Sequence, residues 1–151
     1  LNHLLELIQE RVMYTQRHVG PAWTAGRTLR ERIGSCRDLA MLMVACCRVA
    51  GLPARFVSGY QLQQPAPEQY DLHAWAEVYL PGAGWRGFDP SAGHEVNERY
   101  VVLATSSKPE LTAAVSGTFS GPPNTDSELS WTINVEEESS ETASKSLVQA
   151  A

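Results

Sequence analysis

Apolar residues recur at helical spacing in the first part of the chain. In the first predicted helix they share one face, which consists of Leu1, Leu4, Leu5, Ile8 and Val12. We expect this helix to continue until Gly20 and Pro21 end it, because Gly and Pro together are a typical stop signal. A short second helix is predicted after Thr24, a residue type that favours helix N-caps.

The third predicted helix is apolar on almost every side. It begins at Cys36, and Gly51 followed by Pro53 ends it, as is typical of a left-handed C-cap. Its main apolar side consists of Leu39, Leu42, Met43, Cys46, Val49 and Ala50. A helix with so little polar surface belongs in the middle of a domain.

From Pro53 onward the pattern changes to short apolar runs separated by Pro, Gly, Asn and Asp, as in strands joined by turns. We predict strands at Ala54–Leu62, Leu72–Leu80, Trp85–Phe88 and Tyr100–Ser106, and two more at Thr112–Phe119 and Leu129–Val135. Helices first and a meander of strands afterwards predict an α+β domain in which the core helix packs on an antiparallel sheet. We expect this domain to occupy residues 1–135 and Glu136–Ala151, rich in Glu and Ser, to be a flexible tail.

The amino-acid composition restricts the expected binding partners and the expected cellular compartment. The 151 residues include 12 Lys plus Arg and 17 Asp plus Glu, a net charge of −5 at pH 7 that disfavours nucleic acid or an anionic membrane as a partner. Three cysteines without paired spacing predict free thiols in a reducing compartment, and therefore a cytoplasmic location. They also lack the C-x-x-C spacing of a zinc site, so we predict no metal or other cofactor. Because residue 1 is Leu, we expect the chain to be a fragment of a longer protein.

The start of the third helix carries a candidate nucleophile. Ser35 is the predicted N-cap, and Asp38 three residues later completes a capping box. Cys36 would then occupy the first helical position, where free backbone N–H groups and the helix dipole favour a thiolate and could stabilise an oxyanion. Cys46 and Cys47 lie in the apolar middle of the helix and are expected to be inert.

A nucleophilic thiolate needs a base, and His73 is the best placed of the four histidines. It opens the strand that ends at Leu80. His3 and His18 are expected on or at the end of the first helix, with solvated side chains, and His94 in a loop after Pro90.

Asp89 can orient His73 if the hairpin between them has the right register. If Leu80 pairs with Gly84 across a three-residue loop, Asp89 stands opposite Trp75 and diagonal to His73. Diagonal neighbours are about 7 to 8 Å apart at the backbone, within reach of a His–Asp hydrogen bond. A four-residue loop would put Asp89 on the other face of the sheet.

Taken singly, each of these residues has a structural explanation: Cys36 as a buried thiol, His73 as a sheet histidine, and Asp89 as a turn residue before Pro90. A cysteine at a helix start, then a strand histidine, then an aspartate on the adjoining strand is the arrangement of papain-type catalysis. The combination therefore favours a Cys-His-Asp triad.

Four segments resemble the transglutaminase-like superfamily, in its bacterial cysteine-protease-like branch. They are GSCRDLA at Gly34–Ala40, RVAGLPARFVSGY at Arg48–Tyr60, HAWAEVYLPGAGW at His73–Trp85 and FDPS at Phe88–Ser91. The resemblance extends over roughly residues 20 to 120 and includes the three catalytic positions of the family, which fall on Cys36 as nucleophile, His73 as base and Asp89 as orienter. It implies a papain-like fold, usually with a further N-terminal domain that this chain would lack, and no need for calcium.

The expected activity is acyl transfer on an amide bond of a peptide or protein, through a thioester on Cys36. Water as the acceptor would make the chain a protease or amidase, and an amine would make it a transglutaminase. We favour hydrolysis of a peptide or isopeptide bond, because excluding water requires a tunnel that a small domain is not expected to build. Two alternatives stay open, a non-catalytic domain that binds peptides or acts as a scaffold, and a redox cysteine.

Overall fold

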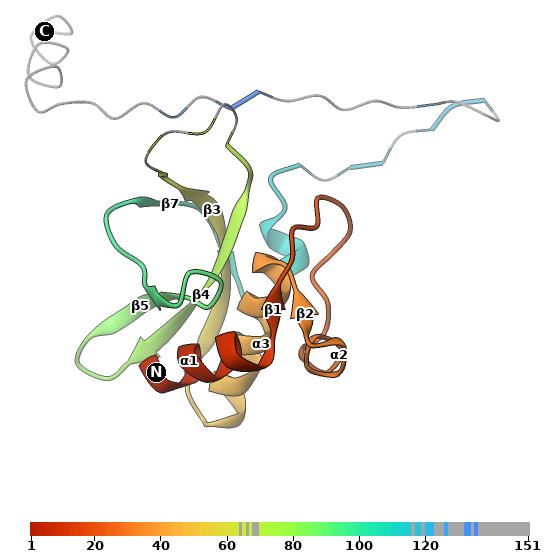
Figure 1. Ribbon diagram of the computed structural model, residues 1–151. Coiled ribbons are helices and arrows are strands. Elements are labelled where there is room, and N and C mark those ends of the chain that lie inside the picture. The colour runs from red at the N-terminus through yellow and green to blue at the C-terminus, as the bar shows by residue number, and fades with distance from the viewer. Residues whose placement is uncertain are drawn as a thin grey trace, which may run out of the picture.

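The computed structural model describes residues 1–63, 65, 67, 70–115, 117, 118, 120–122, 126, 132, 133 and 135 (Figure 1). Within these residues the elements follow in the order α1 (Asn2–Arg11), β1 (Met13–Tyr14), α2 (Ala25–Glu31), β2 (Ile33–Gly34), α3 (Cys36–Val49), β3 (Ala54–Gln61), β4 (His73–Leu80), β5 (Gly84–Asp89), β6 (His94–Glu95), β7 (Tyr100–Ser106) and the 3-10 helix η1 (Pro109–Thr112).

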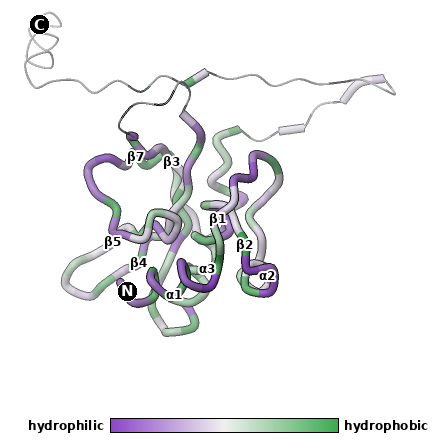
Figure 2. The backbone as a smooth tube through the Cα atoms, viewed as in Figure 1, coloured by the Kyte–Doolittle hydropathy of each residue, from purple (hydrophilic) through white to green (hydrophobic). Residues whose placement is uncertain are grey.

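A mixed arrangement of helices and an antiparallel sheet confirms the predicted α+β class. The five-stranded sheet has the order β6-β5-β4-β3-β7, and all its pairs are antiparallel. Helix α3 packs against β3 and β4, and α1 and α2 pack against α3 (Figure 1). The main core lies between α1, α3 and the sheet and contains Leu5, Ile8, Leu39, Leu42, Met43, Val44, Ala76, Val78 and Phe88. The surface helix α2 is largely hydrophilic (Figure 2), as expected where only one side of a helix is covered.

The hairpin between β4 and β5 has the register that the proposed triad requires, one of the two that the sequence left open. Leu80 pairs with Gly84 across a three-residue loop, and Ala76 pairs with Phe88 farther along the same ladder. The residues of β4 that face α3, Ala74, Ala76 and Val78, are buried. This register is what brings the end of β5 to the start of β4.

The first helix is shorter than predicted, because it ends at Arg11 and not at Gly20 and Pro21. Val12 is extended (φ −131°, ψ 116°), and the chain continues into β1, which pairs in parallel with β2. The apolar helical period stops at Val12, and backbone hydrogen bonds to β2 then satisfy this segment better than a polar helical turn would. His18 consequently lies in a loop. His94, predicted in a loop, lies in β6.

The strand predicted at Thr112–Phe119 is wrong for every residue of it that is described. Thr112 closes η1, which begins at Pro109, and Ala113–Val115, Gly117 and Thr118 are not in a strand. A proline at the start of a turn suits a helix and lacks the N–H that a strand ladder needs. Of the strand predicted at Leu129–Val135, Thr132, Ile133 and Val135 are described and are not in a strand; the rest lies outside the described residues, as does Glu136–Ala151.

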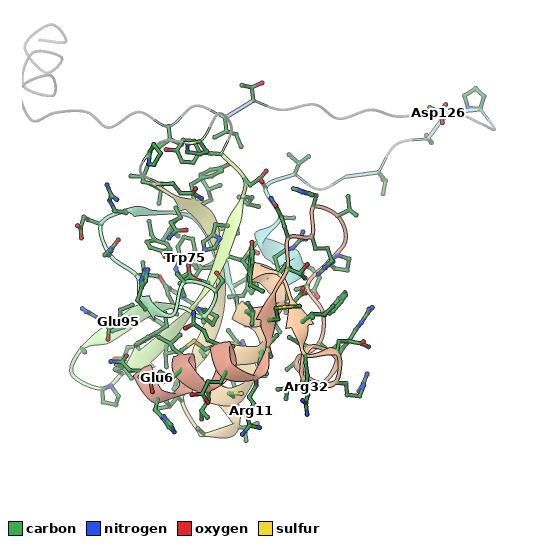
Figure 3. The ribbon with its side chains drawn as sticks, viewed as in Figure 1. Glu6, Arg11, Arg32, Trp75, Glu95 and Asp126 are labelled. Atoms are coloured by element: carbon green, nitrogen blue, oxygen red, sulfur yellow. The ribbon has the colours of Figure 1, made fainter. Side chains whose placement is uncertain are left out.

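Trp75 (labelled in Figure 3) lies in the central strand β4, on the face of the sheet opposite α3. Its side chain is fully buried and packs against the Tyr100 ring at 5.3 Å between centroids. Gly59 lies beneath it at a bulge in β3, and a Cβ there would lie 2.0 Å from the Val101 carbonyl oxygen and 2.6 Å from Trp75. The close approach of β3, β4 and β7 therefore requires glycine at this position.

No helix among the described residues has the length and apolar character needed to cross a bilayer.

Candidate active site

Cys36 is the first residue of α3, as the sequence predicts. Ser35 is the N-cap of the helix. The backbone N and the hydroxyl of Ser35 both donate hydrogen bonds to Asp38 Oδ2, each at 2.8 Å. The first N–H groups of a helix have no partner within the helix. The thiol of Cys36 is therefore held beside backbone donors at a well-anchored helix start.

Asp38 also fastens the preceding loop to this helix start. Its Oδ1 accepts hydrogen bonds from Arg17 Nη2 at 2.6 Å and from Trp23 N at 2.7 Å. Burial would raise the pKa of Asp38, but the hydrogen bonds from Trp23, Ser35 and Arg17 outweigh it and lower the pKa below its usual value. No local pattern connects Arg17 to Asp38, so sequence analysis did not single out this pair.

His73 and Asp89 form a close pair, with 2.6 Å between Nε2 and Oδ2. The Asp89 side chain is fully buried, and that of His73 is 16% exposed. Burial by itself would lower the pKa of His73, yet the hydrogen bonds and charges of Asp89 and Cys36 raise it above its usual value. Burial likewise opposes the charge on Asp89, but the hydrogen bond and charge of His73, with Ser91 and Tyr100, lower the pKa of Asp89. Both shifts favour an imidazolium beside a carboxylate.

Three further residues, to which sequence analysis gave no role, hold Asp89 in place. Its Oδ1 accepts from Ser91 N at 2.9 Å, Ser91 Oγ at 2.6 Å and Ala92 N at 3.1 Å, and its Oδ2 also accepts from the Tyr100 hydroxyl at 2.9 Å. The Ser91 and Ala92 contacts form an Asx-type turn, which the Asp-Pro-Ser sequence could have indicated. The Tyr100 contact depends on the position of β7 in the sheet, for which the sequence has no local signal.

The structure brings the three predicted site residues together around one cavity of about 1030 Å³. Cys36 and His73 both line it, and Asp89 lies behind His73. Since Nε2 is bonded to Asp89, Nδ1 is the ring nitrogen left to face the thiol. The lining of the cavity also includes residues 16–22, part of η1 and Ala113–Val115.

Cys46 and Cys47 lie farther along α3 than Cys36, and Cys47 is buried. All three are free thiols, but burial raises the pKa of Cys46, and burial together with Cys46 raises the pKa of Cys47 to about 11. A thiol with a raised pKa is a poor nucleophile near neutral pH. In the part of the chain that the structure describes, no group of three or more His, Cys, Asp or Glu side chains could hold a metal ion.

Several known proteins are similar to this chain in sequence or in fold. A model of the transglutaminase-like superfamily matches residues 1–90. A solved structure of a candidate cysteine protease from Cytophaga hutchinsonii is 32% identical with a TM-score of 0.62, over 75% of this chain and 37% of that one. This likeness confirms the papain-like fold.

Two curated relatives match smaller parts of the chain. An uncharacterized protein of Mycobacterium tuberculosis is 39% identical over 50% of this chain and 27% of its own length. A protein-glutamine gamma-glutamyltransferase of Pseudomonas aeruginosa is 40% identical over 40% of this chain and 10% of its own length. The chain thus spans less than a third of either relative. Since the family model matches well over half of the residues, the chain belongs to the transglutaminase-like superfamily.

Proposed function

We propose that this chain catalyses cysteine-dependent acyl transfer on amide bonds of peptides or proteins. The observation that carries the proposal is the shared cavity, in which the Cys36 thiol at a helix start faces a histidine that is paired with a buried aspartate. The names of the relatives, a candidate cysteine protease and a glutamyltransferase, support the same reaction class because both activities proceed through an acyl group on an enzyme nucleophile.

In the first step, the Cys36 sulfur attacks the carbonyl carbon of the amide, and a C–S bond forms as the C–N bond breaks. Backbone N–H groups at the start of α3 stabilise the oxyanion. His73 gives the proton on Nδ1 to the departing amine nitrogen, while Asp89 holds the ring through Nε2. The products are a thioester on Cys36 and a free amine.

In the second step, an acceptor attacks the thioester while His73 takes a proton from the acceptor. The C–S bond breaks, and the thiol of Cys36 is restored. Water as the acceptor completes hydrolysis, and a primary amine completes transfer. We place hydrolysis of a peptide or isopeptide bond first, because the structure that bears the protease name is similar over 75% of this chain.

Mass spectrometry after incubation with a library of peptide amides and a primary amine tests the proposal. Wild type should carry an acyl adduct on the peptide that contains Cys36, and Cys36→Ala should carry none. Free acid among the products would indicate hydrolysis, and the amine conjugate would indicate transfer. Cys46→Ala is the matched control and should behave as wild type. The absence of any adduct and any product with wild type, or an adduct that persists in Cys36→Ala, would contradict the proposal.

Alkylation by iodoacetamide at mildly acidic pH separates this reading from the two alternatives. Cys36 should react much faster than Cys46 and Cys47. Equally slow reaction of all three would support a non-catalytic scaffold. Fast reaction of Cys36 that is unchanged in His73→Ala would support a redox cysteine, which does not need the histidine.

A further inference from the structure

The hydroxyl of Tyr100 shares an oxygen of Asp89 with His73. Oδ2 lies 2.9 Å from the Tyr100 oxygen and 2.6 Å from His73 Nε2. The three residues come from β7, β5 and β4, so the contact ties three strands together beneath the cavity. Nothing in the proposed acyl transfer uses Tyr100.

The direction of this hydrogen bond follows from its neighbours. Asp89 is ionised, because its hydrogen bonds and the charge of His73 lower its pKa despite burial, so its Oδ2 only accepts. Tyr100 must therefore donate. Its oxygen in turn accepts from Gln61 Nε2 at 2.8 Å, which leaves the hydroxyl hydrogen free to point at Asp89. Burial and the nearby Asp89 raise the pKa of Tyr100, so the hydroxyl stays protonated.

Two features separate the role of the hydroxyl from that of the ring. The carboxylate cannot turn when the hydroxyl is removed, because Ser91 and Ala92 make three hydrogen bonds to Oδ1. The Tyr100 ring packs against His73 at 6.1 Å and Trp75 at 5.3 Å between centroids, and phenylalanine would keep these contacts. Tyr100→Phe therefore removes two hydrogen bonds, the one to Asp89 and the one from Gln61, and keeps the ring contacts.

We propose, on the basis of the acyl transfer above, that Tyr100 is a positioning residue that acts through Asp89. Its hydroxyl donates a hydrogen bond to Oδ2 and so partly neutralises the carboxylate charge. The carboxylate then stabilises the His73 imidazolium less, which makes transfer of the Nδ1 proton to a leaving amine easier. Gln61 supports this role because it fixes the direction of the hydroxyl.

Other titratable groups lie near Asp89, and Tyr100→Phe changes none of them. His94 of β6 is its neighbour in the sheet ladder, with its ring 6.2 Å from that of Tyr100. Cys36 of α3 and Tyr14 of β1 line the same cavity as His73. A change of titration in Tyr100→Phe therefore reports the lost hydroxyl and not a new charge.

The test combines kinetics with a direct titration of His73. In Tyr100→Phe, the alkaline limb of the pH profile of kcat/KM and the midpoint of the His73 ring signal in NMR should both move up by about 0.5 to 1 pH unit. The rate for peptide amides should fall about tenfold, since a held proton is given up less readily, whereas activated esters should react at the wild-type rate because their leaving groups need no proton. Tyr79→Phe, an exposed tyrosine of β4, is the matched control and should change neither quantity.

A pH profile and an NMR midpoint identical to wild type in folded Tyr100→Phe would overturn the inference. If that variant does not fold, Gln61→Leu should shift both midpoints in the same direction by a smaller amount, and no shift would overturn the inference equally. The NMR titration needs no turnover. An upward NMR shift in a protein without acyl-transfer activity would refute the proposed function alone, and normal activity without a shift would refute the role of Tyr100 alone.

Discussion

At the scale of single residues, Asp89 is the most heavily bonded side chain of the site, with five hydrogen bonds on its two carboxylate oxygens. A buried carboxylate stays ionised only when such partners replace its water. The ionised form is what the proposed mechanism requires, because it favours an imidazolium at His73 over a neutral ring. The charge of Asp89, more than its size, is therefore the property that a mutation should test.

Asp89→Asn should reduce kcat/KM by about 10³- to 10⁴-fold, because the amide has no charge to stabilise an imidazolium. The donors on Oδ1 would hold the amide oxygen there and turn its NH2 group toward His73 Nε2, which favours the wrong tautomer. Steady-state kinetics on the best substrate from the peptide library measures this effect. Glu95→Gln removes an exposed charge from the neighbouring β6 and should leave kcat/KM unchanged. Comparable activity of Asp89→Asn and wild type would rule out the orienting role.

Gly59→Ala should lower the free energy of unfolding by about 3 kcal/mol, because the added Cβ would meet the Val101 carbonyl at 2.0 Å and neither the backbone nor the buried Trp75 can move away freely. Urea unfolding followed by tryptophan fluorescence measures the loss. In α2, Gly26→Ala has no atom within 4 Å of the new Cβ and should be neutral or stabilising by about 0.5 to 1 kcal/mol. Equal stability of the two variants would show that β3 and β7 adapt to the extra atom.

At the scale of elements, the sequence predicted the parts of the site that depend on local patterns. The start of α3 follows from the Ser35-x-x-Asp38 pattern. The Pro-Gly-Ala segment after Leu80 indicated a turn but left two registers of β4 and β5 open, of which the structure has the one that the triad requires. Other features depend on contacts between distant segments and have no such pattern. The two-residue strands β1, β2 and β6 are too short to show a period, and the place of β7 beside β3 is set by packing.

The attachment of the loop at residues 15–24 to α3 is one of these distant contacts, and Asp38→Ala tests it. The variant should lose about 3 kcal/mol of unfolding free energy at pH 7, since Arg17, only 19% exposed, would remain without its carboxylate. The folded pKa of Asp38 lies below its usual 3.8, so the stabilisation is present above about pH 4 and is lost as pH falls through the folded value. The difference from wild type should therefore shrink at pH 3.

Urea titrations at pH 7 and pH 3 measure both quantities. Glu31→Ala, an exposed carboxylate on α2, is the control and should stay close to wild type at both values. A difference between Asp38→Ala and wild type that does not change with pH would show that packing, and not the ion pair, holds the loop.

At the scale of the whole molecule, the nucleophile and its partners belong to different halves of the fold. Cys36 begins α3 on the helical side, whereas His73 and Asp89 lie on strands β4 and β5 of the sheet (Figure 1). Cys36 and His73 both line the cavity. The stability of the fold should therefore depend on the protonation of the His73–Asp89 pair.

The folded pKa of His73 lies above its usual 6.5, so its stabilisation is complete below pH 6.5 and is lost as pH rises toward the folded value. The folded pKa of Asp89 lies below 3.8, so its stabilisation is present above pH 3.8 and is lost in acid. Wild type should lose about 1 to 3 kcal/mol of unfolding free energy between pH 6 and pH 9 that His73→Ala does not lose. Urea unfolding at several pH values checks this, and the exposed His3→Ala should follow wild type. Parallel curves for wild type and His73→Ala would contradict it.

The residues of the site extend along the sequence from Cys36 to Tyr100, so a ribosome synthesises Cys36 first and Tyr100 last. During synthesis Cys36 emerges first. His73, the base that would accept its proton, and Asp89, which orients His73, have not yet been made. The last supporting hydroxyl arrives only with β7, whose pairing to β3 also completes the sheet. Activation of the Cys36 thiol therefore depends on the final stage of folding. A nascent or truncated chain that stops before β7 carries this thiol without its full set of partners.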